Sequence, residues 1–309
     1  MTNPSPGGSL KMILAFAMIY IVWGSTYLAI AFAIDTIPPF LTIGSRFLFA
    51  GMVLYGFLRL KGIKRPPLKR TVNGALIGIF TLGIGTGLIA WAEQYIDSGF
   101  VALIITAVPL WLVLLDWKML KGGAPTRPVI FGLILGFFGI VILTGPEIIS
   151  GAQDSSAMAV FAVLAATLSW SAGSLRSKMI AMPENLFMSS AIQMAAGGAV
   201  MGLLGLALGE WSVFEWGAIS EQSAWAWWYL VIFGSLVAFS AYVWLLANAP
   251  PKQISSYAFV NPVVAVFLGW WLAGEAVNAR ILIAIVIMVS AVSLIILYGG
   301  KPRVKKDLS

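Results

Sequence analysis

The sequence has 309 residues, of which 60% are hydrophobic and 10% charged, and its mean hydropathy is +0.94. A soluble domain of this size cannot hide so much apolar surface, which indicates a polytopic membrane protein. The absence of cysteine and histidine excludes disulfides, Cys/His metal sites, cysteine nucleophiles and Ser-His-Asp chemistry. The chain also lacks the G-x-x-x-x-G-K-[ST] motif, so we expect no ATPase activity, no cofactor and no metal.

Ten apolar stretches follow one another along the chain, each close to the ~20 residues that a helix needs to cross ~30 Å of hydrocarbon. They are predicted at residues 12–34, 40–60, 71–92, 98–120, 128–145, 156–177, 185–209, 225–247, 254–273 and 279–299. We therefore expect an all-α integral membrane protein with ten transmembrane helices.

The charged residues between these stretches segregate by sign. With the spans numbered one to ten, the termini and the loops after even-numbered spans carry 17 of the 19 basic residues: Lys11, Arg59, Lys61, Lys64, Arg65, Lys69, Arg70, Lys118, Lys121, Arg127, Arg176, Lys178, Lys252, Lys301, Arg303, Lys305 and Lys306. Nine of the 12 acidic residues lie on the other side: Asp35, Glu93, Asp97, Glu147, Asp154, Glu210, Glu215, Glu221 and Glu275. Cytoplasmic loops retain Lys and Arg, so we predict a multi-pass inner-membrane protein whose termini, including a basic tail at 300–309, are cytoplasmic. The net charge of +7 then reflects topology and not nucleic-acid binding.

The two halves of the chain show sparse internal similarity. At a shift of 147 or, later in the chain, 153 residues, the matched pairs are Trp23 with Trp170, Phe40 with Phe187, Gly51 with Gly198, Trp91 with Trp244 and Pro109 with Pro262. Five spans per half is an odd number, so the second half enters the membrane from the opposite side. The pattern predicts two inverted five-helix repeats, 12–145 and 156–299, an architecture typical of alternating-access transporters.

Several of these positions carry a family resemblance that spans essentially the whole chain. The matching residues are Trp23-Gly24-Ser25-Thr26-Tyr27, Pro38-Pro39-Phe40, Arg46-Phe47, Ala92-Glu93-Gln94-Tyr95-Ile96, Ser98-Gly99, Pro109-Leu110-Trp111, Tyr257, Val260-Asn261-Pro262-Val263-Val264-Ala265 and Gly274-Glu275. This set resembles EamA-type permeases of the drug/metabolite transporter superfamily. The resemblance implies ten helices, a central cavity between the repeats and efflux of small metabolites, since characterised relatives export amino acids, amines or drugs. The second half departs from the first at Ser171-Ala172, which replace Gly24-Ser25, and at Gln193, which replaces Arg46.

Candidate substrate-binding residues lie near the middle of the spans. Trp23 and Trp170 are mid-span, away from the interfaces that tryptophan usually occupies, and each offers a stacking face and one N–H donor. Thr26 and Ser174 lie one turn further and have hydroxyls, although such hydroxyls often bond back to their own helix. The alternative for the tryptophans is that they are packed core residues.

Two prolines interrupt spans four and nine. Pro109 and Pro262 each lack a backbone donor and free the carbonyl four residues earlier, so they are candidate hinges. Asn261 and Tyr257, beside the second proline, are candidate substrate-binding residues. A structural kink without substrate contact is the alternative.

Three further residues are candidates for gating or coupling. Arg46 lies within span two, where it either extends to the outer surface, pairs with an acid or binds a substrate carboxylate. Glu93 and Gln94 end span three on the outer side, where Glu93 is a candidate titrating group. A solvated helix end is the alternative.

Together these features predict a secondary transporter that exports amino acids or similar small amphipathic metabolites. Multidrug or amine efflux is the alternative within transport, and a membrane subunit of a larger complex is the alternative from another class. The expected partners are a small-molecule substrate and membrane lipid, with protons left open as a coupling ion. We expect a monomer or weak homodimer.

Overall fold

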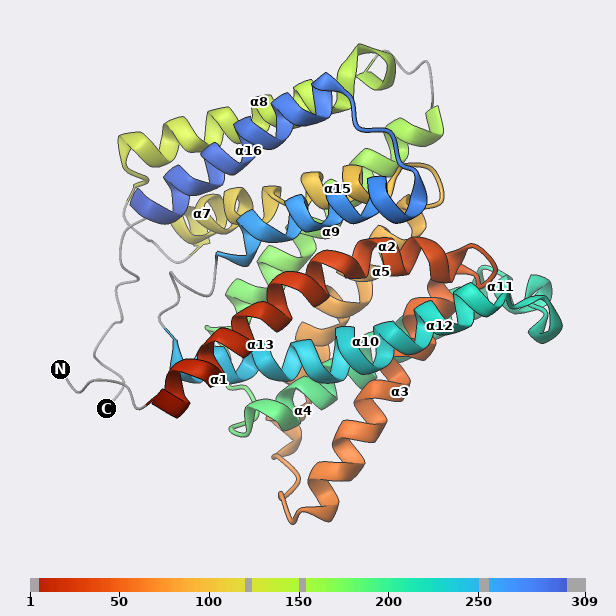
Figure 1. Ribbon diagram of the computed structural model, residues 1–309. Helices are drawn as coiled ribbons and strands as arrows, with labels where there is room; N and C mark the ends of the chain where they lie inside the picture. The colour runs from red at the N-terminus through yellow and green to blue at the C-terminus, as the bar shows by residue number, and fades with distance from the viewer. Residues whose placement is uncertain (1–5, 120–123, 150–153, 250–255, 299–309) are drawn as a thin grey trace.

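The computed structural model describes residues 6–119, 124–149, 154–249 and 256–298, and these residues form helices without any strand (Figure 1). The first five spans contain these elements: α1 Pro6–Ala17, η1 Met18–Val22, α2 Trp23–Ile34, α3 Pro39–Leu60, α4 Leu68–Gly78, η2 Ile79–Gly85, α5 Thr86–Ala92, α6 Ser98–Ile104, α7 Ala107–Met119 and α8 Arg127–Ile149. The remainder are α9 Asp154–Ser177, α10 Leu186–Ala207, α11 Glu210–Val213, η3 Trp216–Ala218, α12 Glu221–Tyr229, η4 Leu230–Val237, α13 Ala238–Asn248, α15 Tyr257–Ala273 and α16 Ala279–Tyr298.

Nine helical segments of the described chain are long and apolar enough to cross a membrane, which confirms an all-helical membrane protein. Their bounds are Leu10–Ile34, Pro39–Leu60, Leu68–Ala92, Ser98–Lys118, Arg127–Gly145, Ser156–Ser177, Leu186–Ala207, Glu221–Tyr242 and Ala279–Tyr298, close to nine of the ten predicted spans. The tenth, predicted at 254–273, corresponds to the 17-residue α15, whose apolar part covers Val260–Ala273. Residues 250–255, like the predicted basic tail at 300–309, lie outside the described residues.

Three spans are interrupted by π-helical segments. The segment η1 follows α1 in the first span, η2 joins α4 to α5 in the third, and η4 joins α12 to α13 in the eighth. A π turn widens the helix by one residue, and such segments are frequent at functional sites. The three segments therefore mark where the backbone departs from regular helix inside the membrane-spanning region.

The second and seventh spans, α3 and α10, pack against each other along a row of glycines. A Cβ atom at Gly44 would lie 2.7 Å from the Cα of Gly202, and one at Gly51 would lie 2.9 Å from the Cα of Ala195. Residues without side chains at these positions let the two backbones touch, as small residues do in membrane helix pairs. Helices α8 and α16 form another close pair on the opposite flank of the bundle (Figure 1).

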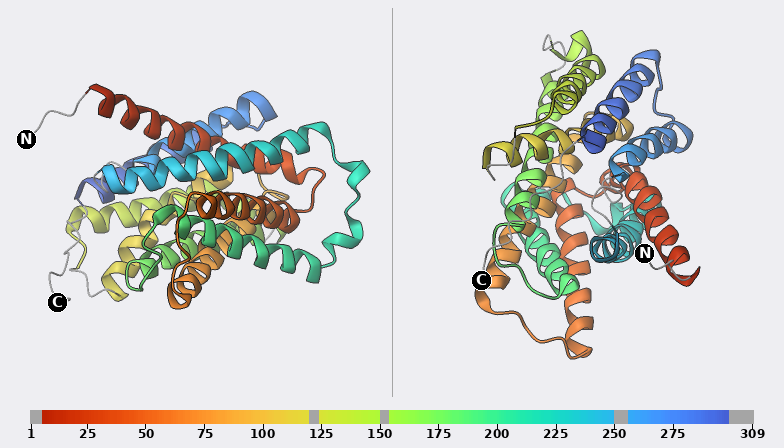
Figure 2. Two further views of the ribbon diagram at one scale, coloured as in Figure 1. Left: turned by 90° about the horizontal axis from the view of Figure 1, so that it is seen from below. Right: turned by 90° about the vertical axis from the view of Figure 1, so that its left-hand side faces the viewer.

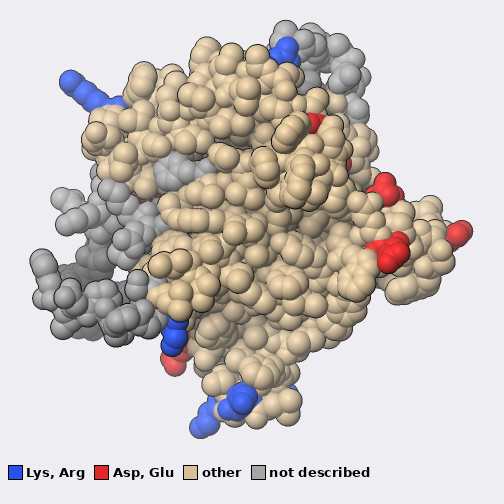
Figure 3. Space-filling model, viewed as in Figure 1, with Lys and Arg blue, Asp and Glu red and all other residues tan. Residues whose placement is uncertain are grey.

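The two ends of the bundle differ in charge. In Figure 3 most visible acidic side chains gather at the end where α11 lies, whereas most basic ones lie elsewhere. We call the end formed by residues 35–38, 93–97, 208–220 and 274–278 the acidic end, and the end formed by 61–67 and 178–185 the basic end. Helix α1 begins and α16 ends on the side of the basic end (Figures 1 and 2).

Candidate substrate and coupling site

One π segment, η4, contacts side chains from two other spans. The guanidinium Nε of Arg46, from α3, donates to Ser235 Oγ at 2.9 Å. The indole Nε1 of Trp23, at the start of α2, donates to the carbonyl of Gly234 at 3.4 Å. Because Gly234 and Ser235 are adjacent, these two candidate residues meet at a single turn of the eighth span. A Cβ at Gly234 would lie 2.8 Å from Arg46 Nη2 and 3.1 Å from Thr26 Cγ2, so a larger residue there would require the guanidinium to shift.

Arg46 is buried, with 4% of its surface exposed. It therefore does not extend to the outer surface, which was one of the alternatives. Its guanidinium lies over the Phe47 ring at 4.6 Å from the centroid, and the hydroxyl of Ser235 that accepts its hydrogen bond carries no charge. A guanidinium has five N–H donors, so most of its donor capacity is not used by the described residues.

Trp23 belongs to an aromatic cluster that also contains Phe239, Tyr242 and Tyr257. Its ring centroid lies 5.0 Å from Tyr242, 5.5 Å from Tyr257 and 6.4 Å from Phe239. The edge-to-face contact with Tyr257 is a favourable aromatic geometry. The cluster presents aromatic faces from the first, eighth and ninth spans at the same place.

Two neutral polar candidates border this cluster. Asn261 is 5% exposed, and its amide, oriented to satisfy its neighbours, donates to the carbonyls of Tyr20 and Tyr257 at 3.2 Å. The hydroxyl of Thr26 donates to the Trp23 carbonyl at 2.7 Å, the local bond that was the alternative for this residue.

Trp170 and Ser174 occupy a different part of the bundle. Trp170, in α9, packs with a hydrophobic cluster that includes Leu82 and Met194, whereas Trp23 packs with Ile19 and Leu245. The carbonyl of Ser174 accepts a bond from the hydroxyl of the residue three positions later, at 2.7 Å. Trp23 and Trp170 are matched when the two halves are aligned, but they lie in different clusters.

The two prolines have unequal effects on their helices. The fourth span divides into α6 and α7 just before Pro109, and the Ile105 carbonyl accepts from Val108 N at 3.0 Å. Pro262 lies inside α15, which continues through it. A break in the helix accompanies the first proline, and the second lies one residue after the buried Asn261.

Glu93 and Gln94 follow α5 at the acidic end and differ in environment. Gln94 is exposed and donates to the Trp91 carbonyl at 3.1 Å, as expected for a solvated helix end. Both carboxyl oxygens of Glu93 are buried and have no hydrogen-bond partner in the described chain. Arg46 and Glu93 are consequently not joined in this conformation. Burial, and secondly the charge of Glu275, hold the pKa of Glu93 well above its ordinary value.

Two other carboxylates at the acidic end bind helix N-termini on neighbouring spans. Glu275, just after α15, accepts from Ser98 N at 3.0 Å, Ser98 Oγ at 2.5 Å and Gly99 N at 2.9 Å, at the start of α6. Glu210, just after α10, accepts from the backbone N–H groups of Phe40 and Leu41 at the start of α3. Free N–H groups and the helix dipole both favour a negative charge at such positions. The sequence did not single out these caps, because the partners are about 170 residues apart.

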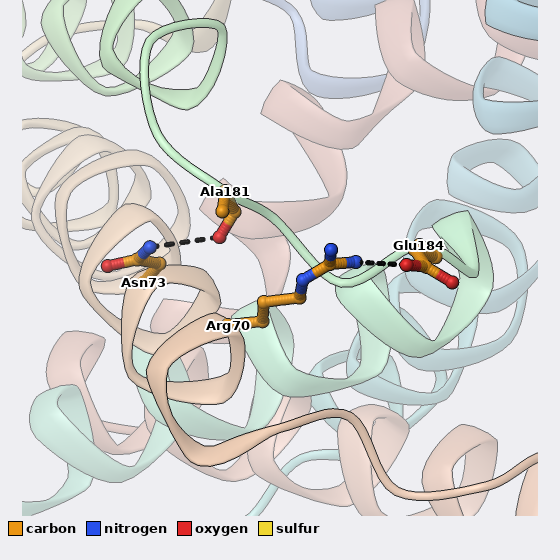
Figure 4. Close-up of polar contacts among 4 residues, drawn as sticks. All are labelled: Arg70, Asn73, Ala181 and Glu184. Atoms are coloured by element: carbon orange, nitrogen blue, oxygen red, sulfur yellow. Dashed lines mark hydrogen bonds and ion pairs between the residues drawn. The ribbon is translucent and has the colours of Figure 1, made fainter. Parts of the chain in front are cut away.

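At the basic end, an ion pair and a hydrogen bond join the two halves of the chain. Arg70, at the start of α4, pairs with Glu184 at 2.5 Å, and Asn73 Nδ2 donates to the Ala181 carbonyl at 2.9 Å (Figure 4). The Glu184 side chain is 84% exposed. These contacts join α4 to the segment before α10 at the surface of the protein.

Comparison with known proteins identifies the family. The profile of the EamA-like transporter family matches residues 10–145 and again residues 157–297. This chain belongs to that family. It is 36% identical over 301 residues to the protein named uncharacterized inner membrane transporter YedA of Escherichia coli strain K12, covering 96% of this chain and 95% of that one. The resemblance found in the sequence motifs is therefore confirmed.

More distant relatives agree with this assignment. The chain is 22% identical over 275 residues to the uncharacterized transporter YoaV of Bacillus subtilis strain 168, covering 89% of this chain and 92% of that one. A solved crystal structure with 19% identity matches with a TM-score of 0.65 and covers 94% of this chain and 99% of the other, which shows a shared fold. The family, its inner-membrane members and the apolar helices indicate a multi-pass inner-membrane transport protein.

Proposed function

We propose that the protein exports amino acids or similar small amphipathic metabolites by alternating access between two inverted five-helix repeats. Two separate matches to one family profile, at 10–145 and 157–297, support the repeat. The segregation of basic residues supports cytoplasmic termini. Reporter fusions after residues 68 and 123 are expected to report cytoplasm, and fusions after 36, 96 and 218 periplasm. A cytoplasmic signal after 218 would contradict the inverted arrangement.

One observation favours an amphipathic substrate with a carboxylate. The buried guanidinium of Arg46 lies at the same turn of η4 as Trp23, whose aromatic cluster offers an apolar surface. A positive charge without an acidic partner attracts a carboxylate and repels a cation, and guanidinium can bind a carboxylate with two parallel bonds. An amino acid presents both a carboxylate and an apolar side chain, whereas an amine drug lacks the carboxylate. The site therefore favours amino acids over amines.

Counterflow into proteoliposomes tests this proposal. A panel of labelled amino acids is compared with matched amines, for example L-tryptophan with tryptamine, which lacks only the carboxylate. We expect exchange of the amino acid, loss of exchange in Arg46→Gln and partial retention in Arg46→Lys. Arg65→Gln, which removes an exposed guanidinium at the basic end, is the matched control. Exchange of tryptamine but not of tryptophan would instead support amine efflux.

A further inference from the structure

The buried carboxyl group of Glu93 has no role in the substrate site proposed above. Both oxygens are inaccessible and without a hydrogen-bond partner in the described residues, although the residue as a whole is half-buried. Its chain neighbours Ala92 and Ile96 belong to a hydrophobic cluster whose other members come mainly from the fourth, fifth, sixth, ninth and tenth spans. Burying an ionised carboxylate without a partner is strongly unfavourable, and such a group takes up a proton instead.

Two groups from two other elements lie within electrostatic range of Glu93. The Tyr27 hydroxyl, from α2, lies within electrostatic range of its carboxyl. Glu275, from the segment after α15, also acts on it, and Glu275 in turn acts on Asp97, just before α6. No cation is among these groups, so the neighbouring charges add to the effect of burial and favour the neutral acid.

Glu93 and Glu275 contrast in their hydrogen bonds. Glu275 accepts three bonds from Ser98 and Gly99, whereas Glu93 accepts none. The hydrogen bonds that stabilise a negative charge at Glu275 are therefore missing at Glu93. The cap formed by Glu275 joins α15 to α6, so separation of these helices would both break the cap and change the charge that Glu93 experiences.

We propose that Glu93 is the proton-binding site that couples transport to the proton gradient. A proton from the acidic end forms an O–H bond on the Glu93 carboxylate, and the neutral acid is buried. That O–H bond breaks in the cytoplasm-facing conformation, where the proton passes to water. One proton enters the cytoplasm, and Glu93 returns to the carboxylate with which the cycle began. The coupling role rests on the proposed function, but proton binding does not.

Infrared titration of the purified full-length protein in lipid nanodiscs tests proton binding without any substrate. We expect a protonated-carboxyl band at neutral pH that is lost in Glu93→Gln and retained in Glu215→Gln, which alters an exposed carboxylate of the acidic end. If the Glu93 band is absent at neutral pH, the carboxyl is ionised and the proposal is wrong, whatever the protein transports.

Proteoliposomes then test coupling. In Glu93→Gln we expect pH-driven transport to be lost while counterflow of the same amino acid persists. Glu215→Gln, which alters an exposed carboxylate of the acidic end, is the control. Transport that responds to external pH but is not driven by the gradient would overturn coupling. Absence of counterflow in the unmodified protein would contradict the proposed substrate. The infrared result would still decide whether Glu93 binds a proton.

Discussion

The acidic and basic ends of the bundle are held together by different kinds of contact. At the acidic end, Glu210 and Glu275 accept hydrogen bonds from the backbone at the starts of α3 and α6. At the basic end, Arg70 pairs with the exposed Glu184. Charge-assisted bonds to helix N-termini contribute more than exposed ion pairs, which are screened by water. Separating the helices at the acidic end therefore disrupts stronger bonds than separating them at the basic end.

The largest effect on stability is expected between the two ends, where α3 contacts α10. A Cβ at Gly198 would meet backbone atoms of Phe47 and Leu48, which cannot move aside as a side chain can. Gly198→Ala is therefore expected to lower the free energy of unfolding by about 1–3 kcal/mol, measured by thermal unfolding in detergent. Gly202→Ala is the control, because nothing lies within 4 Å of the added methyl group. Equal stability of both variants would show that the two backbones are further apart than described.

The next effect tests the acidic end directly. Glu275→Ala removes the acceptor of three bonds at the start of α6 and is expected to lower stability by about 2 kcal/mol. Glu215→Ala, at the same end but exposed, serves as its control. The same change at Glu210, which accepts two backbone bonds, is expected to cost less. A loss no greater than that of the control would mean that the cap does not hold the helices together.

The pH dependence of stability tests whether Glu93 at the acidic end is buried as an unpaired acid. Its pKa in the folded protein is raised above the ordinary 4.5 by burial and by Glu275, so the folded state binds the proton more tightly than the unfolded state does. This contribution is fully present below pH about 4.5 and is lost as pH rises through the folded-state pKa. Unfolding measured across pH is expected to show that decline in the unmodified protein. The Glu93→Gln variant is expected to lose it, and an unchanged profile would contradict burial of an unpaired acid.

The smallest effect is expected at the basic end. Arg70→Ala is expected to lower the free energy of unfolding by less than about 1 kcal/mol, because its partner Glu184 is 84% exposed and the pair is screened. Raising the salt concentration should reduce the difference further. If Arg70→Ala were as destabilising as Glu275→Ala, the two ends would be held equally firmly and the comparison would fail.

The positions of the spans could be predicted from the sequence because hydropathy and length are local properties. The contacts between spans could not, since they join residues far apart in the chain: Arg46 bonds Ser235, 189 positions away, and Glu275 bonds Ser98, 177 positions away. Alignment of the halves drew attention to Trp23 but not to its packing partners Tyr242 and Phe239. The π segments have no sequence signature that we could read, because their wide turns depend on neighbouring helices.

The π segment η2 gives the third span an adjustable register. It lies between α4, which carries Arg70 at the basic end, and α5, which ends immediately before Glu93 at the acidic end. If the extra residue of a π turn were absorbed into regular α-helix, the part of the span beyond it would rotate by about 100°. Glu93 would then turn toward a different neighbouring helix while α4 stayed in place. A single backbone rearrangement inside the membrane would then change which groups surround a buried acid.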